Sequence, residues 1–307
     1  MKIFFLLLFL IASLIAGSQD GKMIEQTKYE VPDSIRSKNK PSAVFYSITY
    51  FSDGLKVKGF IAIPKDNKVH PCVLFNRGGN ENNSMLTNES FARKANFLLD
   101  NGYIFAATQY RGSLGSEGKD EFGGGDVNDV INLIQSLRNI PQADTSRVAL
   151  FGWSRGAINT YVALTKSTNI KAAVIGGGMS DLVKLRDWRK MLDTGLYAKL
   201  IPQYKETKND ELLKQRSALY IADKIPKNCT DTYFTWNSRR KCSCKPVNSS
   251  CSKFYEVRQP FRLILYEGAV HSIEQYRAEY ETEIIKWLNK YVRDGKQAPD
   301  LEPVFKR

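Results

Sequence analysis

Histidine is scarce in this sequence, and the scarcity limits which residues can serve as a base near neutral pH. Only two of the 307 residues are histidines. Imidazole is the side chain best suited to exchange a proton in that pH range, so such chemistry must use His70 or His271. His70 precedes Pro71 at the start of a predicted strand, where a structural role is expected. His271 follows the last predicted strand and is the candidate base.

The sequence also has no apolar run long enough for a comfortable membrane span. A spanning helix needs about 20 apolar residues, and the run from Ile3 to Ile15 is shorter. With Lys2 before it and small residues after it, the run predicts a secretory signal peptide over residues 1–18, cut before Gln19. No cysteine directly follows the run, so a lipoprotein anchor is not expected. The mature protein is expected to be secreted or periplasmic, with no stable membrane anchor.

Basic residues are abundant but dispersed. The chain has 45 Lys and Arg against 32 Asp and Glu, a formal net charge of +13. Nucleic-acid sites gather such residues into a stripe or patch, whereas no run of five or six basic residues occurs here. We therefore expect a basic, solvated surface and no nucleic-acid partner.

The pattern of apolar residues predicts one large α/β domain. A chain of 307 residues with 42% hydrophobic residues can bury a sizeable core. Predicted strands alternate with predicted helices, which favours a mostly parallel central sheet with helices on both faces. The strands are expected at 43–63 (a hairpin turning at Asp53-Gly54), 73–75, 103–108, 148–151, 172–175 and 261–266, and the helices at 90–99, 126–137, 156–166 and 274–292, with a helix-rich excursion at 180–223. The domain is expected to span 43–294, between a lead-in segment at 19–42 and a C-terminal tail at 295–307.

The most informative motif is Gly152-Trp153-Ser154-Arg155-Gly156, a G-x-S-x-G pentapeptide. The apolar run 148–151 precedes it and a helical sequence follows it. A strand, a sharp turn and a helix form a nucleophile elbow, in which neighbouring glycines allow the tight backbone that lifts the serine hydroxyl out of the sheet. The motif predicts that Ser154 is a nucleophile.

Several spaced motifs resemble the catalytic domain of the prolyl oligopeptidase family of serine peptidases, which has the alpha/beta-hydrolase fold. The resemblance runs from Ala43 to Val292. Besides the elbow, it rests on N-R-G-G-N at 76–80, Y-R-G-S at 110–113, D-E-F-G-G-G-D-V-N-D at 120–129, the glycines and S-D at 177–181, and Y-E-G-A-V-H at 266–271.

The resemblance implies roles for individual residues. Ser154 would be the nucleophile and His271 its base, in the chain order of such hydrolases. The oxyanion would be held by the backbone N–H of Arg155 and by a donor from the loop of Asn76, Arg77 and Gly78. A peptide or ester substrate is implied, and no metal or organic cofactor. Asp126 and Asp129 match family positions, but their place at a helix start predicts capping and dipole roles.

The segment 229–254 departs from the family pattern. A family member would have an apolar strand, then His-Gly, then the Asp that orients the catalytic imidazole. Four of the five cysteines fall here instead, at 229, 242, 244 and 251. The segment shows no apolar strand, so the written sequence is expected to leave the sheet without this strand. Asp231 is the only Asp between Asp223 and His271, and is a substitute acid.

Three explanations compete for this segment. The first is an insertion held by disulfides, which an exported protein permits. The second is a zinc site, for which a single C-x-C pair is poor ligand spacing. The third is a local shift of the reading frame. Back-translation with a one-nucleotide shift allows V-P-I-L-I-L-H-G-I-A-D-E-N-V, and Trp236 followed by Asn237 forces its glycine codon. The frame shift is favoured, with the missing Asp at 238–240.

The sequence therefore predicts an exported serine hydrolase that cleaves peptide or ester bonds. Two alternatives remain open: a carboxylesterase of the same fold, and a catalytically silent hydrolase-fold protein that binds a ligand or partner. Substrate preference and oligomeric state do not follow from the sequence.

Overall fold

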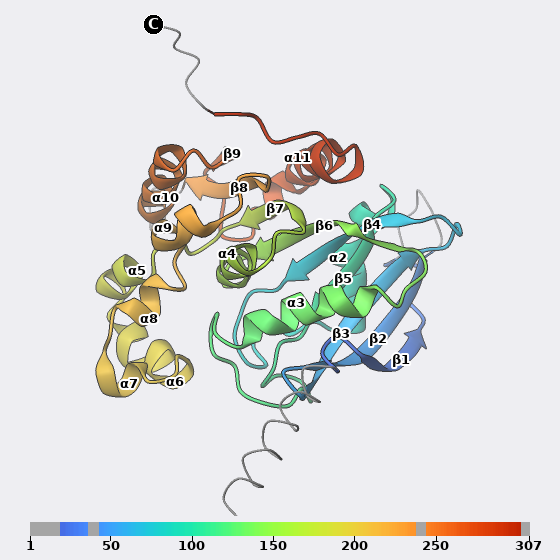
Figure 1. Cartoon of the computed structure of the whole chain (residues 1–307), viewed down its shortest axis with the longest axis horizontal. Coiled ribbons are helices and arrows are strands. Elements are labelled where there is room, and N and C mark those ends of the chain that lie inside the picture. Colours follow the sequence, from blue (N-terminus) through green and yellow to red (C-terminus); the bar gives the residue numbers. More distant parts are fainter. Residues whose placement is uncertain (1–18, 36–42, 238–243, 302–307) are drawn as a thin grey trace, which may run out of the picture.

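The protein is built around one nine-stranded sheet (Figure 1). The computed structural model describes residues 19–35, 43–237 and 244–301; the predicted signal peptide at 1–18 lies outside them. In sheet order the strands are β1 (Met23–Tyr29), β2 (Ala43–Ser52), β3 (Leu55–Pro64), β5 (Ile104–Thr108), β4 (His70–Asn76), β6 (Ala143–Trp153), β7 (Ile170–Gly176), β8 (Thr230–Asn237) and β9 (Phe261–Glu267). From β5 to β9 all neighbours are parallel, whereas β1, β2 and β3 are antiparallel. The predicted mostly parallel sheet is confirmed.

Helices cover both faces of the sheet, as predicted. One core layer joins the sheet to α3 (Asp126–Leu137), α4 (Gly156–Lys166), α9 (Ala218–Ile221) and α10 (Cys244–Glu256). The other core layer joins the sheet to α2 (Asn88–Leu99), α11 (Arg277–Leu288) and η4 (Asn289–Arg293). The short helix η3 (Glu274–Tyr276) directly precedes α11. The helix-rich excursion consists of α5 (Leu182–Trp188), η1 (Asp193–Tyr197), α6 (Ala198–Leu200), α7 (Tyr204–Thr207), α8 (Glu211–Lys214), α9 and η2 (Ala222–Lys224). Its helices pack around a small apolar cluster that also includes Phe122 and Ile158. No helix among the described residues is long and apolar enough to cross a membrane.

The predicted hairpin is present and turns where the sequence indicates. Ser52 pairs with Leu55, so two residues form the loop. Both have positive φ, 52° at Asp53 and 75° at Gly54. This backbone matches the right-handed twist of paired strands, and Asp-Gly adopts it readily.

The predicted lead-in segment contributes a strand to the sheet. β1 pairs antiparallel with β2, and the residues between its two ends are exposed. A solvated edge strand needs few apolar residues, which explains why the sequence pattern gives little sign of it. Val31 and Ile35 then anchor the segment in the core beside α2.

The expectation that the sheet lacks a strand near residue 230 is wrong. β8 runs parallel between β7 and β9. Its sequence, T-D-T-Y-F-T-W-N, is rich in β-branched and aromatic residues, which favour strands even without a continuous apolar run. The proposed position of the missing Asp, 238–240, and Cys242 lie outside the described residues. The thiol of Cys251 is free, and no three His, Cys, Asp or Glu side chains in the described part are grouped to hold a metal ion.

Candidate active site

Ser154 occupies the sharp turn that its motif predicts. It lies between the end of β6 and the start of α4 with φ of 55°, in the left-handed region that few non-glycine residues adopt. Its backbone N–H donates to the carbonyl of Gly176 at 2.8 Å. A Cβ at Gly156 would lie 1.8 Å from the backbone oxygen of Asn76, so the glycine is required there. The turn is thus held by close backbone packing against β4 and β7.

The loop after β4 lies directly against the nucleophile. A Cβ at Gly78 would lie 3.3 Å from Ser154 Cβ and 3.9 Å from its Oγ. The Asn76 side chain points elsewhere, because its Nδ2 donates to Thr160 Oγ1 at 2.8 Å. Of the three residues predicted in this loop, Gly78 is therefore the one whose backbone faces Ser154. Arg155 follows Ser154 directly and precedes α4.

The side chain of Arg77 fixes the shape of this loop. It is buried, with 1% of its surface exposed. Its guanidinium donates to four backbone carbonyls, those of Gly78 (3.0 Å), Glu81 (2.7 Å), Asn83 (3.0 Å) and Gln109 (2.8 Å). An arginine in that position is a brace for the loop rather than a group that reaches substrate.

Arg155 joins the elbow to two buried carboxylates. Its Nη2 donates to Asp120 and to Asp126, each at 2.6 Å. Asp120 also accepts the backbone N–H of Glu81 at 2.8 Å, and Arg155 Nη1 donates to the carbonyl of Gly79 at 3.3 Å. Burial raises the pKa of Asp120. Burial would also raise the pKa of Asp126, but Arg155 and a hydrogen-bonded amide hold it below its usual range. This buried network ties the elbow to the loop that faces it.

The prediction of capping and dipole roles for Asp126 and Asp129 is incomplete. Asp126 accepts the N–H of Gly123 at 3.0 Å, but Gly123 precedes α3, and the N-cap residue Gly125 makes no side-chain cap bond. The main partner of Asp126 is the buried Arg155. Asp129 likewise pairs with a buried arginine, Arg111, at 2.7 Å, and it accepts from Ser52 Oγ at 2.7 Å. Burial raises the pKa of Asp129 to about 6. These pairings join residues far apart in sequence, so helix position alone could not predict them.

His271 lies at the same edge of the sheet as Ser154. It follows β9 as Ser154 follows β6, and both strands belong to the parallel set. A cavity of about 260 Å³ is lined by both Trp153 and Ser272, the residues adjoining Ser154 and His271. The Trp153 ring also packs on Tyr280 of α11, with centroids 5.7 Å apart.

The imidazole of His271 has a lowered pKa. Partial burial of the ring is the larger cause, and the positive charge of Arg189, just after α5, lowers the pKa further. A lowered pKa keeps the ring neutral near pH 7, the form that can accept a proton. The sequence offered no sign of the Arg189 contribution, because Arg189 is distant along the chain.

His70 has the structural environment that its position predicts. It lies at the start of β4, at the sheet edge opposite the elbow, with 6% of its surface exposed. One ring nitrogen is 2.9 Å from the carbonyl of Gly102, and the other is 2.7 Å from Asp66 Oδ1. Both nitrogens are thereby used.

The backbone register places Asp231 at the wrong end of its strand for a triad acid. It is the second residue of β8 and pairs with Ala173, in the middle of β7, and with Phe261, the first residue of β9. His271 comes after the carboxyl end of β9. The prediction of Asp231 as substitute acid is therefore not supported by the fold.

Comparison with known proteins gives consistent matches. Residues 89–295 match the sequence model of the prolyl oligopeptidase family. The chain is 31% identical over 152 residues to the uncharacterized peptidase YtmA of Bacillus subtilis, covering 48% of this chain and 58% of that protein. It is 25% identical over 119 residues to dipeptidyl-peptidase 5 of Porphyromonas gingivalis, covering 36% of this chain and 17% of that protein. Among solved structures, an acylaminoacyl peptidase of Pyrococcus horikoshii has the same fold, with a TM-score of 0.70 at 17% identity over 87% of this chain and 48% of that one.

Proposed function

Because the chain belongs to the prolyl oligopeptidase family, we propose that it is a serine hydrolase that cleaves peptide bonds through an acyl-enzyme on Ser154. The observation that carries the proposal is the elbow. Ser154 has a strained backbone, with φ of 55°, and faces the backbone of Gly78. Strain of this kind persists only where the surroundings hold it, and it is concentrated at functional sites.

The proposed reaction uses His271 as base. The neutral imidazole takes the proton of the Ser154 hydroxyl as its oxygen attacks the scissile carbonyl. In this proposal the oxyanion accepts from the backbone N–H groups of Arg155 and Gly78. The imidazolium then protonates the leaving amine, the acyl-enzyme forms, and water releases the acid by the same steps in reverse.

The proposed site lacks an identified carboxylate to orient the His271 imidazole. Loss of the carboxylate that orients the imidazole lowers kcat about 10⁴-fold in a serine protease that keeps the rest of its site. The fold argues against Asp231 in this role. We therefore expect slow turnover from the chain as written, and a large gain if the segment 229–254 is restored to the shifted frame.

Labelling by a fluorophosphonate probe tests the proposal. The probe should modify the purified protein, and Ser154→Ala should abolish labelling. The matched control is Ser146→Ala, which removes an exposed serine at the other end of the same strand and should label normally. An unlabelled, folded protein would leave the catalytically silent alternative. If labelling succeeds, turnover of short acyl esters without cleavage of any peptide would identify a carboxylesterase.

We also propose that the protein is exported. Support comes from the sequence: Lys2, the apolar run and the small residues before Gln19. Mass spectrometry of protein recovered from the native host should find Gln19 as the first residue. A mature chain that retains residues 1–18 would refute export by this route.

A further inference from the structure

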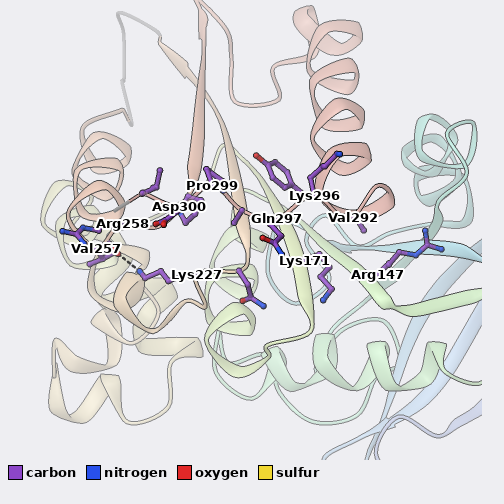
Figure 2. Close-up of a pocket in the computed structure, with 16 residues that line it drawn as sticks. Arg147, Lys171, Lys227, Val257, Arg258, Val292, Lys296, Gln297, Pro299 and Asp300 are labelled. Carbon is purple, nitrogen blue, oxygen red and sulfur yellow. Dashed lines mark hydrogen bonds between the residues drawn. The ribbon is translucent and has the colours of Figure 1, made fainter. Parts of the chain in front are cut away.

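A second cavity lies at the sheet edge opposite Ser154. It has a volume of about 700 Å³ (Figure 2). It is lined by Arg147 in the first half of β6, by residues at or just before the amino ends of β7, β8 and β9, by η4 and by the segment 295–301. Arg147 in this wall precedes Ser154 by seven positions on one strand, which is roughly 20 Å of extended chain. A ligand here would therefore be separate from the elbow.

The charged residues of the cavity are mostly cations. Arg147, Lys171, Lys227, Arg258 and Lys296 line it. Among the described lining residues, the only carboxylate is that of Asp300. Figure 2 shows Lys227 and Arg258 on one side and Arg147 on the other, with Lys171 between them. An anion inside would be surrounded by positive charge.

The three lysines of the cavity have no carboxylate within ion-pair distance among the described residues. Arg147 pairs with Asp144 at 2.6 Å, outside the cavity. Lys227 donates to the backbone carbonyl of Val257 at 2.5 Å, a neutral partner. Among the described residues, no carboxylate lies within ion-pair distance of Lys171, Lys227 or Lys296, and only Lys227 has a more distant counter-charge, that of Asp223. A concave surface with uncompensated cations raises the local concentration of anions.

The rest of the wall is apolar. Tyr291 and Val292 are buried beneath it, and Val257, Pro299 and Leu301 contribute further apolar surface. A cavity of about 700 Å³ is within the ordinary range for small-molecule sites, which combine an apolar lining with a few placed polar groups. A bare inorganic ion would leave this apolar surface uncovered.

We propose that this cavity binds a small organic anion, with one phosphate or carboxylate group held by Lys171, Lys227 and Lys296 and a short apolar body against Tyr291 and Leu301. The site does not take part in the proposed hydrolysis, and the proposal does not depend on the reactivity of Ser154. A phosphate head binds more tightly than a carboxylate head, because it carries more charge and more acceptor oxygens.

Calorimetric titration of the full chain at low ionic strength tests this with four probes: hexyl phosphate, hexanoate, inorganic phosphate and hexanol. Hexyl phosphate should bind most tightly and hexanoate more weakly, with inorganic phosphate weaker than hexyl phosphate and hexanol not binding. Added salt should weaken the binding of both organic anions. Equal binding of hexanol, or no binding of hexyl phosphate, would overturn the proposal.

Lysine variants locate the site. Lys171→Met and Lys227→Met keep the apolar stem, so folding should be preserved, and each should weaken hexyl phosphate binding about fivefold, the effect of about one close charge pair in water. The matched control is Lys224→Met, an exposed lysine three residues before Lys227 that does not line the cavity; it should bind as the unaltered protein does. Equal weakening by the control would show a general charge effect and refute the site.

The rate at which the fluorophosphonate probe labels Ser154 shows whether the anion binds in the cavity or at the elbow. Saturating hexyl phosphate should leave fluorophosphonate labelling unchanged. Protection of Ser154 would place the anion at the elbow and overturn the proposal. If the protein does not label at all, the hydrolytic function fails, and the lysine variants still decide the anion site.

Discussion

The buried pair between Arg155 and Asp126 should make the elbow sensitive to the loss of one charge. Asp126 has none of its surface exposed, and its carboxylate is 2.6 Å from the guanidinium. Removing one partner of a buried ion pair costs about 3–5 kcal/mol. Because Asp120 continues to pair with Arg155, we expect Asp126→Asn to cost about 3 kcal/mol, a large part of a stability of about 5–15 kcal/mol.

Thermal unfolding measures this cost. At about 2–4 °C per kcal/mol for a domain of this size, Asp126→Asn should lower the midpoint by about 6–12 °C. The matched control is Asp187→Asn, which removes an exposed partner of Arg186 and should cost under about 1 kcal/mol. Below its unfolding transition, Asp126→Asn should also label more slowly at Ser154. Equal midpoints for the two variants would refute the assigned importance of the pair.

Three further experiments, two substitutions and one DNA resequencing, test other features of the chain. Arg189→Gln should shift the acidic limb of the pH–rate profile to higher pH. Partial burial and then the charge of Arg189 lower the pKa of His271, so removal of that charge raises the pKa of a base that must be unprotonated to act. An unmoved limb would mean that another group titrates. Gly156→Ala should lower the unfolding midpoint, since overpacking costs about 1–3 kcal/mol or more. The control Gly195→Ala should leave the midpoint unchanged, because nothing lies within 4 Å of its new Cβ. Similar midpoints for the two variants would contradict the packing argument. Resequencing the DNA that encodes 229–254 should reveal two compensating indels, and a clean read would show that β8 and α10 are encoded as written.

The elements that the sequence predicted well carry strong local signals. The helix at 126–137 repeats apolar residues with helical period, and α3 has the same bounds. The Asp53-Gly54 turn and the Gly-flanked Ser154 likewise need only a few neighbouring residues to specify them.

The features that the sequence missed depend on distant contacts or on context. β1 is polar because it lies at an edge, and β8 has strand-forming residues without an apolar run. The attachment of Arg155 to Asp120 joins positions 35 residues apart, and no periodicity encodes such a pairing. Among the predicted site residues, Ser154 and Gly78 lie close together because the turn after β6 packs against the loop after β4.

The polar edge strand has a consequence for how copies of the protein meet. An uncovered strand can recruit a strand from a neighbouring molecule and start aggregation, and natural sheets resist this with charged side chains. β1 presents Glu25 and Lys28 in an exposed run, and Glu25 is held by Lys58 of β3 at 2.9 Å. Neutralising these charges would remove a barrier to self-association without touching the interior.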